Sequence, residues 1–332
     1  MKFIAEIGIN HNGSIKTAKK MIDKAFDVGV DIVKFQSYDV DYLLDKKTKK
    51  AKYQSVNLKN KSLSQYQMLK KYELSKKNQI DLINYCKKKK IEYLFSVFDN
   101  ESLKFLLNQK IKKIKIPSGE MDNLLLLNGL KKFKGEILIS TGMSNMTEIV
   151  KTLNFLNKIG IKKKQITLFY CVTDYPTNFK DLNLNTLSYF KKKFNLSVGF
   201  SDHTLGLEAP IAATTFGLKY IEKHVTLDKK NFGPDHKASL NFKEFSSMIL
   251  CCKNIKKSLK KFSKIVSIQE KRNSKFVRKF LFAREDIKIG DKFTFENLIG
   301  KRFGKGIPVG NLKKILNKKS KKNFFKDQLI NI

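Results

Sequence analysis

The chain has 332 residues, 41% of them apolar, and a formal net charge of +38 at pH 7. This length fits one large domain or a domain of roughly 250 residues with a small partner, and the apolar content excludes a disordered chain. No apolar run approaches the ~20 residues of a membrane-spanning helix, and the first residues form no signal-peptide core, so we expect no membrane association.

The basic residues are almost all lysine and are spread along the chain in short runs such as 87–90 and 191–193. A nucleic-acid reader instead clusters its charge and uses arginine forks for bases and phosphates. We therefore interpret the charge as solvated lysine surface and expect no nucleic-acid partner. The cysteines show neither metal-ligand spacing nor disulfide density, which favours a cytoplasmic protein. They are Cys86, Cys171, Cys251 and Cys252.

Short apolar runs of β type recur along the chain, and stretches with helical spacing lie between them. The runs are 3–9, 31–35, 92–97, 113–116, 136–140, 166–171, 196–200 and 220–225, and the helical stretches include 15–28, 78–88, 145–158 and 181–194. Eight such units within about 250 residues predict an α/β fold, a closed (β/α)₈ TIM barrel. An open doubly wound sheet alternates similarly, but no glycine-rich phosphate-binding turn follows the first run.

The remaining segments predict the domain organisation. Residues 38–74 are too long for an ordinary connection, so we expect them to fold over the barrel mouth. We predict a barrel domain over 1–262, ending in a helical, lysine-rich stretch over 242–262, and a mostly polar linker over 263–275. Residues 276–332, with five glycines and short β-like runs, predict a second domain that is too small to be very stable alone.

All four histidines lie in polar clusters at or just beyond the ends of predicted strands, which form the catalytic face of a barrel. His203 and His224 are 21 residues apart, about one βα repeat, so both rings reach the same rim and are candidates to share a divalent metal. Histidines held only by local hydrogen bonds are the alternative. The other two are His11 and His236.

Two lysines, Lys34 and Lys115, interrupt apolar runs, where an ammonium group facing the barrel interior is costly without an anion. Solvent exposure is the alternative for any one lysine in so basic a chain. Glu6 and Glu120 end such runs as candidate acid or base groups, or as partners of a sugar hydroxyl. Hydroxyl groups at comparable positions suit a phosphate or carboxylate substrate. They belong to Ser37, Ser96, Ser118, Ser140, Thr141, Thr173 and Ser201.

A series of motifs, taken in order, resembles the sialic acid synthase family. These motifs are Ala5-Glu6-Ile7-Gly8-Ile9-Asn10-His11-Asn12-Gly13, Val33-Lys34-Phe35-Gln36, Ile116-Pro117-Ser118-Gly119-Glu120, Ser140-Thr141-Gly142-Met143, Tyr175-Pro176-Thr177, Ser201-Asp202-His203-Thr204 and Gly233-Pro234-Asp235-His236-Lys237-Ala238-Ser239. The tail from 277 to 332 resembles that family's small, β-rich antifreeze-protein-like (SAF) domain. Each motif is weak alone, but the ordered set spans nearly the whole chain and is highly specific.

The resemblance implies a metal-dependent barrel that condenses phosphoenolpyruvate with an N-acetylated amino-sugar aldehyde to give a nonulosonic acid and phosphate. The acceptor would be N-acetylmannosamine or 2,4-diacetamido-2,4,6-trideoxymannose, giving N-acetylneuraminate or legionaminate. The motif 233–239, with the stretches 51–54 and 64–68, is more similar to these two branches than to the pseudaminic branch. Because the family's tail arginine reaches across a two-fold axis, the resemblance also implies a domain-swapped homodimer.

The resemblance further implies a role for each site residue. Mn²⁺ or Mg²⁺ would be held by His203 and His224. Phosphoenolpyruvate would be surrounded by Lys34, Ser96, Lys115, Ser118, Ser140, Thr173 and Ser201. The sugar would meet Glu6, Gln36, Tyr175, Asp235 and Arg302, with Glu120 near the reacting carbons. The expected catalytic residues are therefore Glu6, Glu120, His203 and His224.

Three positions depart from the family pattern, and two other functions stay open. Val97 and Phe303 replace prolines, which changes loop rigidity, and Tyr170 stands where a histidine is common. One rival is a different phosphoenolpyruvate-condensing barrel, against which the tail and its Arg302 argue. The other is a non-catalytic polyanion-binding barrel, which would bind polyanions in a salt-sensitive way and release no phosphate.

Overall fold

The computed structural model describes residues 1–49, 64–260 and 263–331. The chain divides into two compact units, Met1–Lys260 and Lys261–Ile332. Within the described ranges, no helix combines the length and apolar character needed to cross a membrane. The stretch 51–54, expected to mark the branch of the family, lies outside the described residues, as does part of the long segment 38–74.

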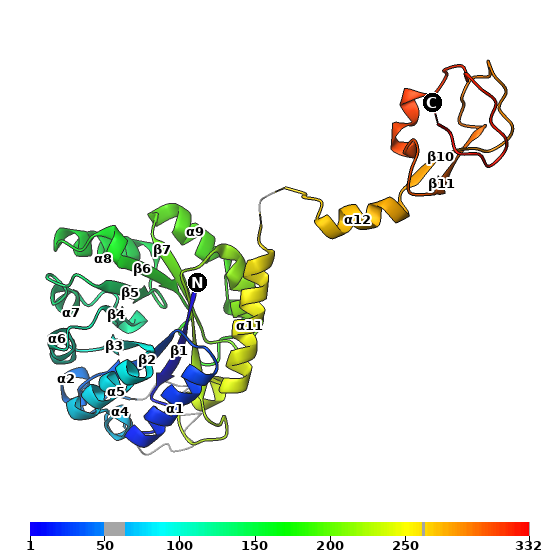
Figure 1. The fold of residues 1–332 in the computed structure, drawn as a ribbon. Helices are drawn as coiled ribbons and strands as arrows, with labels where there is room; N and C mark the ends of the chain where they lie inside the picture. Colours follow the sequence, from blue (N-terminus) through cyan, green and yellow to red (C-terminus); the bar gives the residue numbers. More distant parts are fainter. Residues whose placement is uncertain (50–63, 261–262, 332) are drawn as a thin grey trace. The chain divides into compact units, whose positions relative to one another are not determined.

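Eight parallel strands form a closed barrel in the first unit, which confirms the predicted fold (Figure 1). β1 pairs with β2 on one side and with β8 on the other, and this closes the sheet. The strands are β1 (Lys2–Gly8), β2 (Ile32–Ser37), β3 (Glu92–Val97), β4 (Lys113–Ile116), β5 (Glu136–Ser140), β6 (Ile166–Tyr170), β7 (Ser197–Asp202) and β8 (Tyr220–Thr226). A short strand β9 (Leu240–Asn241) pairs with β8.

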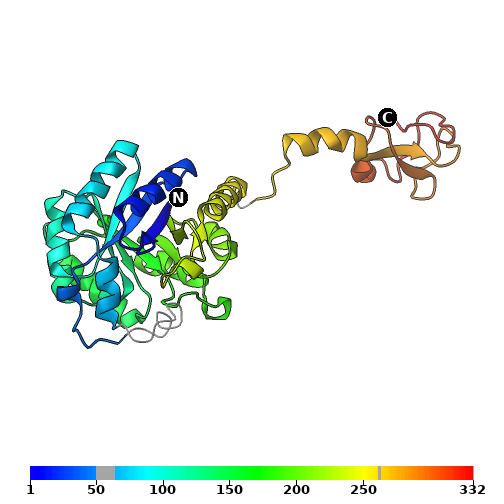
Figure 2. The same cartoon turned by 90° about the horizontal axis from the view of Figure 1, so that it is seen from below.

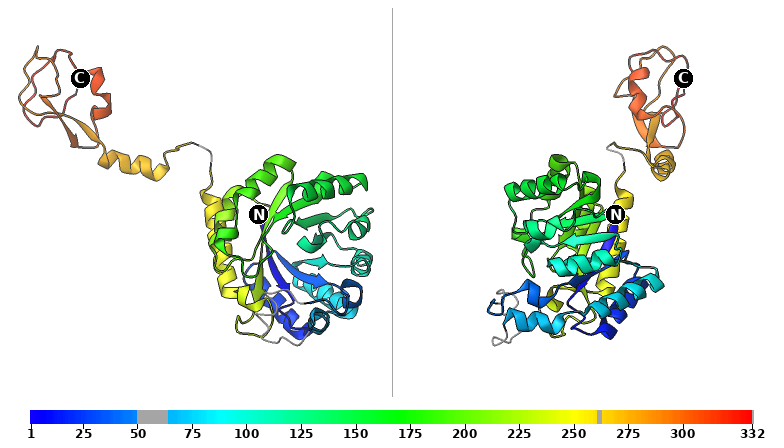
Figure 3. Two further views of the ribbon diagram at one scale, coloured as in Figure 1. Left: turned by 180° about the vertical axis from the view of Figure 1, so that it is seen from behind. Right: turned by 90° about the vertical axis from the view of Figure 1, so that its left-hand side faces the viewer.

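Helices surround the strands on the outside, with α1 beside α5 (Figure 2) and α11 along β8 and β9 (Figure 3). Polar side chains cap the N-termini of helices such as α1 and α8. Ser14 accepts from the N–H of Thr17 at α1, and Asn145 forms a reciprocal cap with Glu148 at α8. The helices are α1 (Ile15–Asp27), α2 (Val40–Leu43), α4 (Gln65–Tyr72), α5 (Lys76–Lys89), α6 (Asn100–Asn108), α7 (Leu124–Asn128), α8 (Met146–Lys158), α9 (Asn185–Phe194), α10 (Glu208–Ala213) and α11 (Phe242–Ser258).

Two apolar layers hold the barrel together. The larger lies between strands and helices and includes Val33, Ile114 and Phe245. The smaller fills the barrel interior and consists of Ile4, Ile32, Leu94, Leu138, Phe169 and Tyr220. Because side chains alternate along a strand, the residues two positions later face the same interior, one layer nearer the carboxyl ends. The interior cluster therefore forms an apolar layer directly beneath the polar residues of the barrel mouth.

The described residues of the second unit include the α-helix α12, a 3₁₀ helix (Val309–Lys314) and a small β structure with its own core. α12 (Ile268–Val277) covers the second half of the segment 263–275 that was expected to be a linker and extends two residues beyond it, and it begins with a reciprocal cap between Ser267 and Glu270. β10 (Lys279–Ala283) and β11 (Leu298–Arg302) pair antiparallel. The core of this unit consists of Leu281, Ala283, Ile287, Phe293, Leu298, Ile315, Phe324 and Ile330.

Candidate active site

A cavity of about 390 Å³ opens at the carboxyl ends of the barrel strands. Its wall includes every predicted barrel site residue except Glu120. These are Glu6, Lys34, Gln36, Ser96, Lys115, Ser118, Ser140, Thr173, Tyr175, Ser201, His203, His224 and Asp235. The interior cluster explains several of them, because Glu6, Lys34, Ser96 and Ser140 each follow one of its members by two residues.

Lys34 is buried among oxygen atoms on the inner wall of the barrel. Its Nζ lies 3.0 Å from Glu6 Oε2, 3.5 Å from Glu222 Oε1, and donates to Ser96 Oγ at 2.9 Å. Strand register brings the first contact about, because β1 and β2 pair Glu6 directly with Lys34. Of the two alternatives for this lysine, the structure has it buried in the barrel interior rather than exposed to solvent.

Lys115, on β4, is also buried and shares the Glu222 carboxylate with Lys34. Its Nζ lies 3.1 Å from Glu222 Oε2 and 3.6 Å from the ring centroid of Phe169. Ser201 Oγ donates to Glu222 Oε1 at 2.8 Å. Two lysines and the two carboxylates of Glu6 and Glu222 therefore form one buried cluster, in which unpaired charge would be costly.

The environment sets the protonation of this cluster. Burial raises the pKa of Glu6 to about 7, although Lys34 opposes the shift. Burial acts the same way on Glu222, but Lys115 and Lys34 outweigh it and lower the pKa of that carboxyl to about 2. Burial also lowers the pKa of Lys115, whereas the facing carboxylates Glu222 and Glu6 outweigh burial and raise that of Lys34.

His203 and His224 meet at one edge of the cavity, with ring centroids 5.7 Å apart. His203 Nδ1 lies 2.6 Å from the carbonyl oxygen of Val172 and donates to it, so the lone pair is on Nε2, which lies 3.4 Å from Ser201 Oγ. His224 Nδ1 is buried and has no hydrogen-bond partner among the described residues. Burial lowers the pKa of His203 to about 4 and that of His224 well below its usual value, so both rings are neutral at pH 7.

Two neutral imidazoles with available nitrogen atoms fit a divalent metal. The described residues contain no group of three or more His, Cys, Asp or Glu arranged to hold such an ion. The pair would therefore leave the remaining coordination positions to water and substrate oxygen atoms, as in catalytic metal sites. The ring of Tyr175 packs beside the pair, with its centroid 4.1 Å from that of His203.

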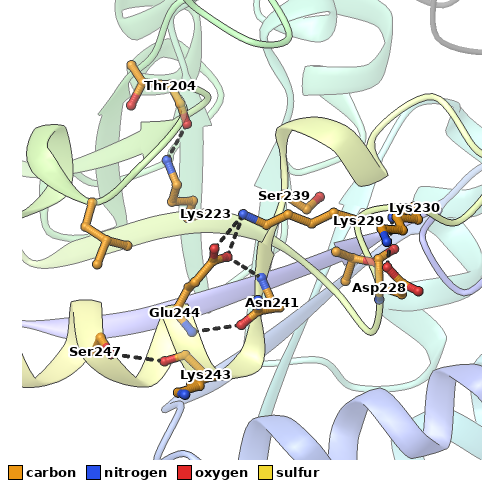
Figure 4. Close-up of polar contacts among 12 residues, drawn as sticks. Thr204, Lys223, Asp228, Lys229, Lys230, Ser239, Asn241, Lys243, Glu244 and Ser247 are labelled. Carbon is orange, nitrogen blue, oxygen red and sulfur yellow. Dashed lines mark hydrogen bonds and ion pairs between the residues drawn. The ribbon is translucent and has the colours of Figure 1, made fainter.

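Outward-facing neighbours of the two histidines tie their strands together. Lys223 and Asp202 form a fully buried ion pair between β8 and β7. Lys223 Nζ also donates to the carbonyl oxygen of Thr204 at 2.6 Å, and Lys229 Nζ contacts Glu244 at the start of α11 (Figure 4). The Lys223 contacts link the ends of β7 and β8, from which the two histidines project. The Lys229 contact anchors the loop that continues to Asp235.

The other two histidines serve the loops of the barrel mouth. His11 Nδ1 accepts from the N–H of Gly13 at 3.0 Å. His236 Nδ1 lies 2.8 Å from Thr226 Oγ1, and its Nε2 lies 3.2 Å from Asn12 Oδ1. The loop after β1 and the loop after β8 are thereby joined at the seam where the barrel closes, and these histidines need no ligand to be satisfied.

The walls around the cluster differ in polarity. On one side, Ser118 Oγ accepts from the N–H of Gly142 at 3.0 Å, and a side chain at Gly142 would strike Thr173 Oγ1. Thr173 Oγ1 is buried without a partner among the described residues, so it is available to an anion. The opposite wall is more apolar and includes Ile9, Tyr38, Leu43, Leu44, Leu69 and Phe98. Burial raises the pKa of Asp235, on the cavity wall, to about 7.

One predicted residue of the barrel, Glu120, does not line this cavity. Glu120 accepts from Asn123 Nδ2 at 2.7 Å in a short 3₁₀ helix after β4, where burial raises its pKa. Arg302 ends β11 in the second unit and is exposed there. Conversely, Glu222 and Cys171 line the cavity without having been predicted. Alternation along β8 carries a signal for Glu222, because it stands two residues before His224 and so shares its face.

In sequence and in structure, the chain is similar to proteins of one family. The model of the NeuB family matches residues 21–264. The chain is 43% identical over 327 residues to the N,N'-diacetyllegionaminic acid synthase of Campylobacter jejuni, covering 98% of each chain. It is 34% identical to the synthase of the same name from Legionella pneumophila, covering 96% of this chain and 90% of that protein. The crystal structure of N-acetylneuraminic acid (sialic acid) synthetase from Leptospira borgpetersenii, in complex with citrate, matches with a TM-score of 0.70 and 29% identity, covering 82% of this chain and 89% of that one.

Proposed function

This chain belongs to the NeuB family, and from that membership we propose that it is an enzyme that condenses phosphoenolpyruvate with an amino-sugar aldehyde and water to give a nonulosonic acid and phosphate. The observation that carries the proposal is the convergence of two buried lysines and two neutral histidines on one cavity. Of the two acceptors, we propose 2,4-diacetamido-2,4,6-trideoxymannose and a legionaminate product, supported by the 43% identical relative.

One set of polar residues in the cavity would bind phosphoenolpyruvate, and a second set would bind the sugar. Lys34 and Lys115 would bind the charged groups of phosphoenolpyruvate, with hydroxyl groups of Ser96, Ser118, Ser140, Thr173 and Ser201 donating to its oxygen atoms. Glu6, Gln36, Tyr175 and Asp235 would orient the sugar. With both substrates held in reach, C3 of phosphoenolpyruvate bonds to the aldehyde carbon, water adds at C2, and phosphate leaves.

A divalent metal, Mn²⁺ or Mg²⁺, would be held by His203 and His224, and when bound it would supply Lewis-acid polarisation of the aldehyde oxygen. The chain's contribution is to keep both rings neutral by burial and to fix the His203 tautomer through Val172. The buried lysines and hydroxyl groups offset charge on the phosphate oxygens as the phosphate leaves. Glu120 is proposed to act near the reacting carbons.

We further propose that the second unit is the SAF domain of a homodimer, in which Arg302 enters the partner's site. Arg302 is exposed at the end of β11, and its planar guanidinium can bind an acetamido carbonyl and hydroxyl groups together. Mixing Arg302→Ala protein with His203→Ala protein should regenerate activity in mixed dimers. Absence of recovery despite proven subunit exchange would show that Arg302 does not act across the dimer.

The direct test incubates the purified protein with Mn²⁺, phosphoenolpyruvate and each of the two amino sugars, and measures product mass and phosphate release. We expect a legionaminate mass from the diacetamido sugar. Product from N-acetylmannosamine alone would reassign the acceptor. Binding of polyanions without phosphate release would favour the non-catalytic alternative, against which the assembled cavity argues.

The cysteines are all free, which supports a cytoplasmic enzyme.

A further inference from the structure

We propose that Glu222 is a positioning residue that holds Lys34 and Lys115 ready for phosphoenolpyruvate. The inference rests on the proposed function, because its task is to prepare the binding site of that substrate. Glu222 lies on the inner face of β8, where it is 3% exposed. Its neighbour Lys223 instead pairs with Asp202, so the two charged residues serve different sides of the strand.

A single carboxylate spans the barrel between two lysines of other strands. Glu222 Oε2 lies 3.1 Å from Lys115 Nζ on β4, and Oε1 lies 3.5 Å from Lys34 Nζ on β2. Ser201 Oγ, on the adjacent strand β7, donates to Oε1 at 2.8 Å. Both carboxylate oxygens are therefore engaged, and the three contacts fix the side chain between the two ammonium groups.

The two lysines depend on Glu222 to different extents. Lys34 has a second anionic partner, Glu6, at 3.0 Å. Lys115 is 1% exposed, and Glu222 is the one carboxylate paired with it in the described part of the chain. Without Glu222, the Lys115 ammonium group would be left on the ring of Phe169 with no counter-ion, which is a costly state for a buried charge.

Loss of that counter-ion would lower the pKa of Lys115, so that this lysine gives up its proton more easily. Burial already lowers the pKa of this lysine, and the Glu222 carboxylate opposes the shift. The titratable groups that face Lys115 are Glu222 on β8, Lys34 on β2 and Cys171 after β6, and of these Glu222 is the paired anion. Glu222 thus keeps Lys115 charged and in place while no substrate occupies the site.

The test compares Glu222→Gln with the unaltered enzyme over a range of pH. The amide keeps the size of the side chain but removes its charge, so we expect KM for phosphoenolpyruvate to rise by about tenfold or more. The alkaline limb of kcat/KM for phosphoenolpyruvate should move to lower pH, because Lys115 loses its proton more easily. KM for the sugar should change much less. Glu222→Asp restores the charge and should recover part of both effects.

Glu136→Gln is the matched control, since Glu136 also accepts from a lysine of the barrel, Lys219, but lies outside the cavity. It should leave both the phosphoenolpyruvate KM and the alkaline limb unchanged. A Glu222→Gln enzyme with an unaltered limb and equal effects on both substrates would overturn the inference. If that variant does not fold, the same two readouts on Glu222→Asp decide.

The unaltered enzyme separates this inference from the function on which it rests. Phosphoenolpyruvate and inorganic phosphate are each added to it, and the rise in melting temperature is measured. No stabilisation and no product would reject the proposed function itself. Stabilisation and turnover, with Glu222→Gln binding phosphoenolpyruvate as tightly as the unaltered enzyme at every pH, would reject only the role of Glu222.

Discussion

The two ends of the barrel use the same residue types in opposite ways, and β4 shows the contrast within three residues. Lys113, at the start of the strand, pairs with Glu92, whose side chain is 42% exposed. Lys115, two residues later, pairs with Glu222, whose side chain is 4% exposed. Both lysines have a carboxylate partner, so burial alone separates a surface ion pair from a charged group of the cavity.

The carboxyl groups at the two ends also differ in pKa. At the amino end, burial raises the pKa of Glu136, but hydrogen bonds from Lys219, Thr167 and Tyr220 outweigh it and lower the pKa overall. At the carboxyl end, burial raises the pKa of Glu6 and Asp235 to about 7. Partners thus stabilise the charged form of Glu136 at the amino end and of Glu222 in the cavity, whereas the cavity keeps Glu6 and Asp235 at a cost in stability, as is typical of functional sites.

The largest effect should come from the histidine pair at the carboxyl end. Chelation of divalent metal, or His203→Ala or His224→Ala, should lower turnover on the order of 1000-fold, because a Lewis acid contributes several kcal/mol. Phosphate release measured with and without Mn²⁺ checks this, and metal binding to the variants should be lost as well. Full activity in excess chelator would contradict the role of the histidines.

The two lysines of β4 test the contrast directly. Lys115→Ala should raise KM for phosphoenolpyruvate by about 10- to 100-fold, as expected for loss of a charged hydrogen bond. Lys113→Ala, with the same change two residues away, should leave that KM within about twofold, because its pair belongs to the surface. Initial rates at varied phosphoenolpyruvate check both. Equal KM values for the two variants would remove the distinction between the ends.

The pH dependence of stability should have opposite signs for Asp235 in the cavity and Glu136 at the amino end. Asp235→Asn should raise the melting temperature above pH 7, and the gain should vanish below about pH 4. Between about pH 4 and pH 7 the Asp235 carboxyl holds a proton in the folded state and has lost it in the unfolded state, so the stability of the unaltered protein falls as the pH rises through this range. Glu136→Gln should lower the melting temperature at pH 7, with a loss that disappears as the pH falls through the lowered pKa. Melting curves from pH 8 down to well below pH 4 check both, and equal signs would contradict the comparison.

The smallest effect should come from the surface pairs of the amino end. Lys2→Ala removes one of the two lysines that contact Glu92, and it should change the free energy of unfolding by less than about 1 kcal/mol. Denaturant unfolding at low and high salt measures this, and the difference should shrink as salt increases. Activity should stay unchanged, and a loss of turnover would extend the functional region beyond the carboxyl end.

Local patterns in the sequence were sufficient for the architecture and for much of the cavity. Alternating strands and helices predict the closed barrel, because each strand buries two faces and each helix one. Lys34 and Lys115 stand out because a charge within an apolar run must find an anion. His203 and His224 reach one rim because one βα repeat separates them. These features depend on residues near one another in the chain or on a repeat of fixed length.

Which charges meet depends on the packing of the whole barrel. Glu222 and Lys115 are 107 residues apart, and their contact depends on how strands on different sides of the barrel face one another across its interior. The pKa values of Glu6 and Asp235 likewise follow from burial, which no local pattern states. The strands and the residue types at their ends follow from local sequence patterns. The closure and stagger of the barrel decided their partners, because side-chain electrostatics depend on distances through space and not along the chain.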